Sequence, residues 1–214
     1  AIAGGVTTLV DMPYDNPEPL STAAHLAAKV EAIGRHAHAN VALYGTVMPG
    51  QPLDDVKALI DGGVVAFKIS AFESSPTRFP RINAALTLDL LEALAHTVVP
   101  LGLHNEDQEI VRSRVERARG AGHNGIAVHS HSRPPAAELA STAHFLELAA
   151  AAGAHAHIVH ISLPRGFQMV ENYRRDGYRA TGETCVHYFW FDPERDGAEL
   201  GARMKVNPPI RSGM

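Results

Sequence analysis

Residues 98–107 read Val-Val-Pro-Leu-Gly-Leu-His-Asn-Glu-Asp, an apolar run that ends abruptly on polar side chains. Residues 64–70 (Val-Val-Ala-Phe-Lys-Ile-Ser) and 157–162 (His-Ile-Val-His-Ile-Ser) have the same form. Short apolar runs of this kind predict buried strands. In a parallel barrel the C-terminal ends of the strands surround one mouth, so residues far apart in the sequence converge there. Three metal-capable side chains are therefore candidates for one reaction centre: Lys68, His104 and His160.

Strand patterns alternate with helical patterns along the whole chain. The strands are expected at residues 6–12, 41–48, 64–70, 98–104, 156–162 and 179–185. The helices are expected at residues 22–36, 53–61, 88–96, 106–119, 136–152 and 165–175. This alternation indicates a parallel α/β sheet, and both an open doubly wound sheet and a (β/α)8 TIM barrel fit it. No Gly-x-Gly-x-x-Gly follows the first strand, which disfavours a dinucleotide-binding open sheet.

Composition limits the class of protein. The chain has 214 residues, of which 45% are apolar and 20% charged, as in an ordinary globular domain. A formal net charge of -4 without a basic block gives no footprint for nucleic acid or for an anionic membrane. No apolar run approaches the roughly 20 residues of a membrane span, and no leader pattern opens the chain. We therefore expect a cytoplasmic protein with neither nucleic-acid nor membrane partners.

The chemistry of the three candidates suggests a metal site. Neutral imidazole nitrogens of His104 and His160 could bind zinc. The ammonium of Lys68 would be repelled by a cation, so in such a site it must be neutral or modified. Reaction with carbon dioxide would turn it into a carbamate, whose two oxygens can bridge two metal ions. Taken singly, each residue also fits an ordinary structural role, an exposed lysine or a hydrogen-bonded histidine.

Six motifs, in this order, resemble the cyclic amidohydrolases, the family of dihydroorotases, allantoinases and hydantoinases. They are Gly-Gly-Val-Thr-Thr-Leu-Val-Asp-Met-Pro (4–13), Phe-Lys (67–68), His-Asn-Glu-Asp (104–107), Ile-Val-His-Ile-Ser (158–162), Gly-Glu-Thr-Cys-Val-His-Tyr-Phe (182–189) and Lys-Val-Asn-Pro-Pro-Ile-Arg (205–211). The resemblance implies a TIM-barrel hydrolase that opens a cyclic amide or ureide with two divalent metal ions, usually zinc. It implies that carbamylated Lys68 bridges the metals and that His104 and His160 bind the second one. It also implies a homodimer or tetramer.

The resemblance also indicates what the chain lacks. Family members carry a His-x-His pair on the first barrel strand and an aspartate on the last, and neither occurs at a corresponding place here. We therefore expect residues 1–214 to form a single partial TIM-barrel catalytic domain, truncated at both ends and covering about strands 2–7. Such a fragment should be inactive by itself.

Two further residues are candidates for substrate binding. Asn207 corresponds to an asparagine that dihydroorotases use against the substrate ring, although a turn residue before Pro-Pro explains it equally well. Ser74 lies in Glu-Ser-Ser-Pro-Thr-Arg-Phe-Pro (73–80), which is more similar to allantoinases. Tyr14 replaces an asparagine typical of dihydroorotases, and Glu73 replaces a tyrosine typical of hydantoinases. We therefore expect an allantoin-like or dihydroorotate-like substrate.

Other polar residues are expected to be structural. Asp11, Glu183 and His187 lie at or near strand ends, where most such groups cap or form ion pairs. Cys185 is the single cysteine, so an internal disulfide is excluded. Cys185 and His187 could pair as nucleophile and base, but no third group that would orient the histidine is evident. The histidines of the 120–134 loop are expected to be solvated: His123, His129 and His131. For the chain as a whole, the alternative is a non-catalytic amidohydrolase-like scaffold that oligomerises.

Overall fold

The structure is a computed structural model that describes residues 1–123 and 125–213. Six parallel strands form one sheet in sequential order. They are β1 (Thr8–Asp11), β2 (Asn40–Gly45), β3 (Ala66–Ser70), β4 (Leu101–His104), β5 (Ala156–Ile158) and β6 (Ala180–Gly182). All six predicted strands are confirmed, each at shorter length than expected.

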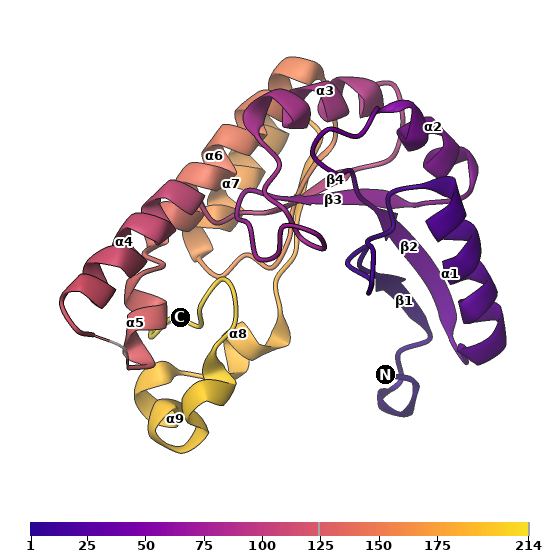
Figure 1. Cartoon of the computed structure of the whole chain (residues 1–214). Coiled ribbons are helices and arrows are strands. Elements are labelled where there is room, and N and C mark those ends of the chain that lie inside the picture. The colour runs from indigo at the N-terminus through magenta and orange to yellow at the C-terminus, as the bar shows by residue number, and fades with distance from the viewer. Residues whose placement is uncertain (124, 214) are drawn as a thin grey trace.

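Helices connect successive strands. The crossover helices are α1 (Ala23–His36), α2 (Asp54–Asp61), α3 (Ala84–Leu94), α4 (Gln108–Gly120), α6 (Pro135–Ala152) and α7 (Pro164–Arg175). Figure 1 shows the sheet bent into an arch, with α1, α2, α3, α6 and α7 along its outer side. Helices on a single face of a curved parallel sheet are typical of a barrel, whereas a doubly wound sheet is covered on both faces. The arch therefore confirms the barrel expectation.

Short helices lie at the rim and after the last strand. They are α5 (Ala127–His131), α8 (Val186–Trp190), α9 (Pro193–Leu200) and the 3-10 turns η1 (Ile2–Gly4) and η2 (Gly201–Met204). Of these, α5, α8, α9 and η2 were not expected from the hydrophobic pattern. Across residues 1–123 and 125–213, no helix is both long and apolar enough to cross a lipid bilayer.

The core lies between the sheet and the outer helices. Phe67 and Ile69 of β3, Leu101 of β4 and Ile158 of β5 are each at most 1% exposed and belong to one apolar cluster. Because side chains alternate along a strand, the intervening residues face the inside of the arch. The β3 and β4 register pairs Ser70 with His104, so the lysine and histidine positions share that concave face.

Helix ends follow local capping chemistry. The α3 helix begins earlier than predicted because the Asn83 side chain accepts a hydrogen bond from the Leu86 amide at 2.9 Å. Pro135 begins α6, and Gly153 ends it in the left-handed conformation with φ of 68°, as proline and glycine at these positions should. These signals fix the helix that carries Glu138.

Candidate metal centre

The two strand-end histidines meet on the concave side of the sheet. His104 is the last residue of β4, and His160 follows β5 by two residues. Their Nδ1 and Nε2 atoms, respectively, are 2.9 Å apart, although the residues are separated by 56 positions. The rings are edge-on, with centroids 4.8 Å apart. One nitrogen of each ring is thus directed at the same small volume.

Both imidazoles are held neutral. Burial lowers the pKa of His104 to about 3, and the charges of Lys68 and Arg133 act in the same direction. Burial also lowers the pKa of His160 well below its ordinary value, again assisted by Lys68. A neutral imidazole keeps the lone pair that a metal ion requires.

Lys68 is buried beside these histidines. The residue is 6% exposed, and its Nζ atom lies 5.5 Å from the centre of the Tyr14 ring and 5.7 Å from that of Phe79. Burial lowers the pKa of the amine to about 8, although the nearby Glu183 opposes that shift. Near pH 7 roughly one amine in ten is then neutral, and the neutral form is the one that reacts with carbon dioxide.

The two facing histidine nitrogens fit one zinc ion. Two nitrogens bound to one tetrahedral zinc ion at about 2.0–2.1 Å lie about 3.3–3.4 Å apart, so the observed 2.9 Å between His104 and His160 needs only a small separation. Within residues 1–123 and 125–213, no group of three or more His, Cys, Asp or Glu side chains could hold a metal. A further ligand from this part of the chain would therefore have to come from Lys68, as its carbamate.

A buried carboxylate orients His104. The Oε2 atom of Glu106 lies 3.0 Å from His104 Nε2, and its Oε1 atom lies 3.2 Å from Arg133 Nε. Glu106 is 1% exposed, and burial raises its pKa above the ordinary value although the charge of Arg133 opposes that shift. An ionised carboxylate accepts a hydrogen bond from Nε2–H, so the lone pair of His104 lies on Nδ1 and faces His160. Sequence reasoning did not assign this role, although the two-residue spacing in His-Asn-Glu-Asp was visible.

The backbone at His160 is unusual. Its φ angle is 41°, in the left-handed region that non-glycine residues rarely occupy. The next amide, that of Ile161, donates to the Glu183 carbonyl at 2.8 Å. The Ser162 amide donates to Glu138 Oε1 at 2.8 Å, and the Ser162 hydroxyl donates to the same carboxylate. These bonds hold the chain on the C-terminal side of His160.

Arg211 joins the two carboxylate clusters. It donates to the Arg133 carbonyl at 2.6 Å, to Glu138 Oε2 at 3.4 Å and to Ser162 Oγ at 3.3 Å. Burial raises the pKa of Glu138, whereas hydrogen bonds from Ser162 and the charge of Arg211 lower it. Neither Glu138 nor Arg211 was predicted to support the site.

Ser74 and Asn207 line one pocket. It has a volume of about 1080 Å³ and lies between α4, α5, the loop after β3 and the segment after η2. Both side chains are exposed, and Arg133 contributes to the same wall. Lys68, His104 and His160 do not line this pocket. Arg133 lines the pocket and also pairs with Glu106, which contacts His104, so it connects the pocket to the two histidines.

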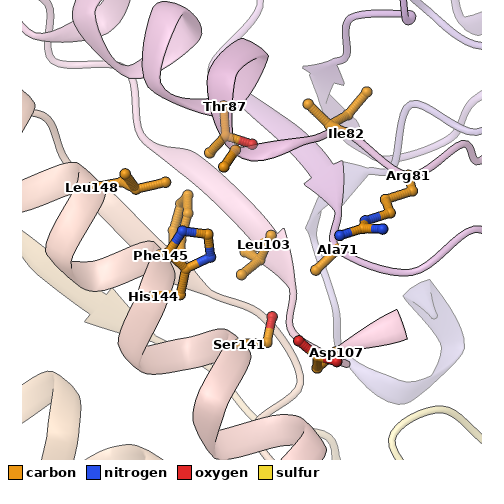
Figure 2. A pocket seen from close by; sticks show the side chains of 11 residues that line it. Ala71, Arg81, Ile82, Thr87, Leu103, Asp107, Ser141, His144, Phe145 and Leu148 are labelled. Carbon is orange, nitrogen blue, oxygen red and sulfur yellow. The ribbon is translucent and has the colours of Figure 1, made fainter. Parts of the chain in front are cut away.

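A second, smaller cavity lies on the other side of the sheet. It has a volume of about 80 Å³ and lies between α3 and α6, where Thr87, Ser141 and His144 surround it (Figure 2). Leu103 also lines it, and the strand alternation points Leu103 away from the face of His104. A cavity of this volume is large enough for a few water molecules but too small for a cyclic substrate.

The structure gives three of the remaining polar candidates, Asp11, Cys185 and His187, surroundings that fit a structural role. Asp11 forms an ion pair with Lys29 at 2.8 Å. Burial and the charge of Glu183 raise the pKa of the Cys185 thiol, which disfavours a thiolate nucleophile. His187 packs against the Tyr188 ring, with centroids 4.3 Å apart.

The expectation of a solvated histidine loop is wrong for His129. Its Nε2 atom lies 2.9 Å from the Val206 carbonyl, and Arg133 Nη1 donates to its Nδ1 at 3.2 Å. The residue lies in α5, which packs the loop against the C-terminal segment. His123 and His131 are exposed, as expected.

The curved parallel sheet, with helices on its outer side, is part of a TIM barrel, and comparison with known proteins identifies what the chain resembles. An allantoinase from Solibacter usitatus is 35% identical over 209 residues, covering 98% of this chain and 45% of the relative. An allantoinase from Rubrobacter xylanophilus is 35% identical over 212 residues, covering 98% and 46%. The structure of L-hydantoinase (dihydropyrimidinase) from Arthrobacter aurescens matches with a TM-score of 0.93 at 27% identity, covering 98% and 46%.

Over 98% of its length the chain is similar to these cyclic amidohydrolases. It spans slightly less than half the length of the relatives that it matches. No protein-family model matches the sequence.

Proposed function

We propose that the chain supplies the lysine-bridged half of a two-metal site that hydrolyses a C–N bond of a cyclic amide or ureide. The observation that carries the proposal is the pair of neutral imidazole nitrogens, His104 Nδ1 and His160 Nε2, 2.9 Å apart beside buried Lys68. Allantoin-like rings come first among substrates, since the two relatives named above are allantoinases.

Each residue would have a separate task. His104 and His160 would bind one divalent ion through the two facing nitrogens, and the carbamate of Lys68 would offer one oxygen to each of two ions. When bound, such ions lower the pKa of a water molecule and polarise the carbonyl that it attacks. Hydrolysis adds water across the C–N bond, so the ring opens to a ureido acid. The proton of that water passes to the leaving nitrogen.

The substrate would reach the centre from the pocket that Ser74 and Asn207 line. A hydroxyl and an amide can donate to the ring carbonyls and accept from the ring N–H groups. Arg112, Arg119 and Lys205 line the same pocket. Their positive charges would suit the carboxylate of the opened product.

The scaffold alternative rests on a different observation. Three residues of α8 expose large apolar side chains: Val186 is 77% exposed, Phe189 75% and Trp190 69%. Exposed apolar groups of this size are typical of surfaces that contact another protein. A scaffold has no need of buried Lys68 next to two neutral histidines, which favours the hydrolase.

The test uses the full-length protein loaded with zinc in bicarbonate buffer. It is assayed for ring opening of allantoin, dihydroorotate, hydantoin and dihydrouracil, with His160→Ala and His144→Ala as variants. We expect one ring to be opened, a loss of more than about 100-fold in His160→Ala, and normal turnover in His144→Ala, whose exposed side chain lies on the outer face. If the zinc-loaded protein opens none of these rings, the scaffold is favoured.

A further inference from the structure

We infer that Glu106 and Glu138 are positioning residues, one for each metal-binding histidine, and that Arg133 and Arg211 join them into a single buried network. The inference rests on the proposed function, because it assigns to these residues the task of aiming two metal ligands. It adds residues from the loop before α6 and from the C-terminal segment to a centre otherwise built at strand ends.

Glu106 acts on His104 directly. Its Oε2 atom is 3.0 Å from His104 Nε2, and both residues are almost fully buried, at 1% and 3% exposure. Since an ionised carboxylate only accepts hydrogen bonds, the contact places the imidazole proton on Nε2. Nδ1 then presents its lone pair toward His160. The ion pair with Arg133 at 3.2 Å holds the other carboxylate oxygen.

Glu138 acts on His160 through Ser162. The left-handed φ of 41° at His160 costs free energy and persists only where the neighbouring backbone is tied down. Ser162, two residues further on, is fully buried and gives both its amide and its hydroxyl to the Glu138 carboxylate. Glu138 is itself 1% exposed, so water does not compete for these bonds.

Charge balance links the two carboxylates. Arg133 pairs with Glu106 at 3.2 Å, and Arg211 pairs with Glu138 at 3.4 Å. The Arg211 guanidinium also donates to the Arg133 carbonyl at 2.6 Å. Two carboxylates and two guanidiniums thus neutralise one another behind the histidines. In a buried network of this kind the side chains resist rotation, because turning any one of them away would leave its partner's charge buried and unpaired.

The experiment measures zinc affinity of the full-length protein by competition with a chromophoric chelator. The variants are Glu106→Ala, Glu106→Gln and Glu138→Ala, with Glu109→Gln as the matched control on the exposed side of α4. We expect a 10- to 100-fold loss of zinc affinity in the two alanine variants, partial recovery in Glu106→Gln, and no change in the control. Should Glu138→Ala fail to fold, Ser162→Ala removes one of its two donors and should lose affinity to a smaller degree.

Metal-free 15N NMR of the imidazoles provides the second readout. The wild type should carry the His104 proton on Nε2, and Glu106→Ala should lose that single tautomer. Wild-type zinc affinity retained in both Glu106→Ala and Glu138→Ala would overturn the inference. If the wild type binds no zinc, the proposed function fails, whereas an unchanged His104 tautomer in Glu106→Ala would overturn the inference independently of any metal.

Discussion

The Nδ1 atom of His104 lies 2.9 Å from the Nε2 atom of His160, so the two rings meet through different nitrogens. Glu106 explains why His104 faces His160 through Nδ1, because the Glu106 carboxylate contacts the other ring nitrogen, Nε2. His160, which contributes the second ring, has a left-handed backbone conformation. A metal ion that replaced the hydrogen bond between the rings would find both ligands already aimed.

Zinc should therefore stabilise the folded protein. At a free zinc concentration of 100 times Kd, mass action adds about 2.7 kcal/mol to the free energy of unfolding. Thermal unfolding with and without zinc measures the effect, and a chelator should reverse it. In the double variant His104→Ala/His160→Ala, the gain in the free energy of unfolding caused by zinc should shrink to the small value expected of weak, nonspecific binding at the surface.

Substrate affinity should depend on the pocket residues. Ser74→Ala and Asn207→Ala each remove one hydrogen bond to the ring, worth about 1 kcal/mol, so KM should rise about fivefold while kcat changes little. Steady-state kinetics on the preferred substrate measure both constants. Thr77→Ala is the control, because this residue lies on the same loop outside the pocket. A fall in kcat with unchanged KM would contradict the assignment.

The alternation of strands and helices was predictable because each element carries its own pattern. Apolar runs such as residues 64–70 end at Gly, Pro or polar residues, and α6 carries proline and glycine at its ends. The rim helices were missed because α5 and α8 have only five residues each, too few for a helical period. Asn83 was missed as the cap of α3 because the helix was expected to begin only at residue 88.

Tyr44 should report on the curvature of the sheet. Burial raises its pKa to about 12, and the charge of Glu183, which follows β6, contributes from across the arch. The pKa of Tyr44 is higher in the folded protein than in the unfolded chain. Its contribution to the free energy of unfolding is therefore fully present below pH 10 and is lost as the pH rises through about 12. The loss is about 3 kcal/mol.

Ultraviolet titration of tyrosinate in the folded protein measures this ionisation. Tyr44→Phe should remove the transition near pH 12, and Glu183→Gln should shift it downward. A transition at the ordinary tyrosine pKa would mean that Tyr44 is not enclosed by the arch.

Gly166 should resist substitution for a steric reason. A Cβ atom added there would lie 2.7 Å from Ile161 Cγ2, and Ile161 follows His160 directly. Gly166→Ala should therefore destabilise the fold by about 1–2 kcal/mol, despite the better helix propensity of alanine. Gly34→Ala, in α1 with nothing within 4 Å, should instead stabilise by about 0.5–1 kcal/mol. Denaturant unfolding compares the two, and equal effects would contradict the packing around Ile161.

The network behind the histidines could be predicted only in part. Glu106 lies two residues from His104, close enough for a motif to suggest a contact. Arg211 contacts Glu138 and Arg133 from 73 and 78 positions away, and no local pattern marks such a pairing. The backbone angle at His160 is likewise set by tertiary hydrogen bonds rather than by its own sequence.

Lys68 provides the most direct test of a lysine-bridged metal centre. Metal analysis of the full-length protein, purified and loaded in bicarbonate buffer, should find close to two divalent ions per chain in the wild type. Lys68→Ala should bind neither ion tightly and should lose hydrolysis, while Lys57→Ala, an exposed lysine paired with Asp61, should match the wild type. Two retained ions with normal turnover in Lys68→Ala would contradict the proposed centre.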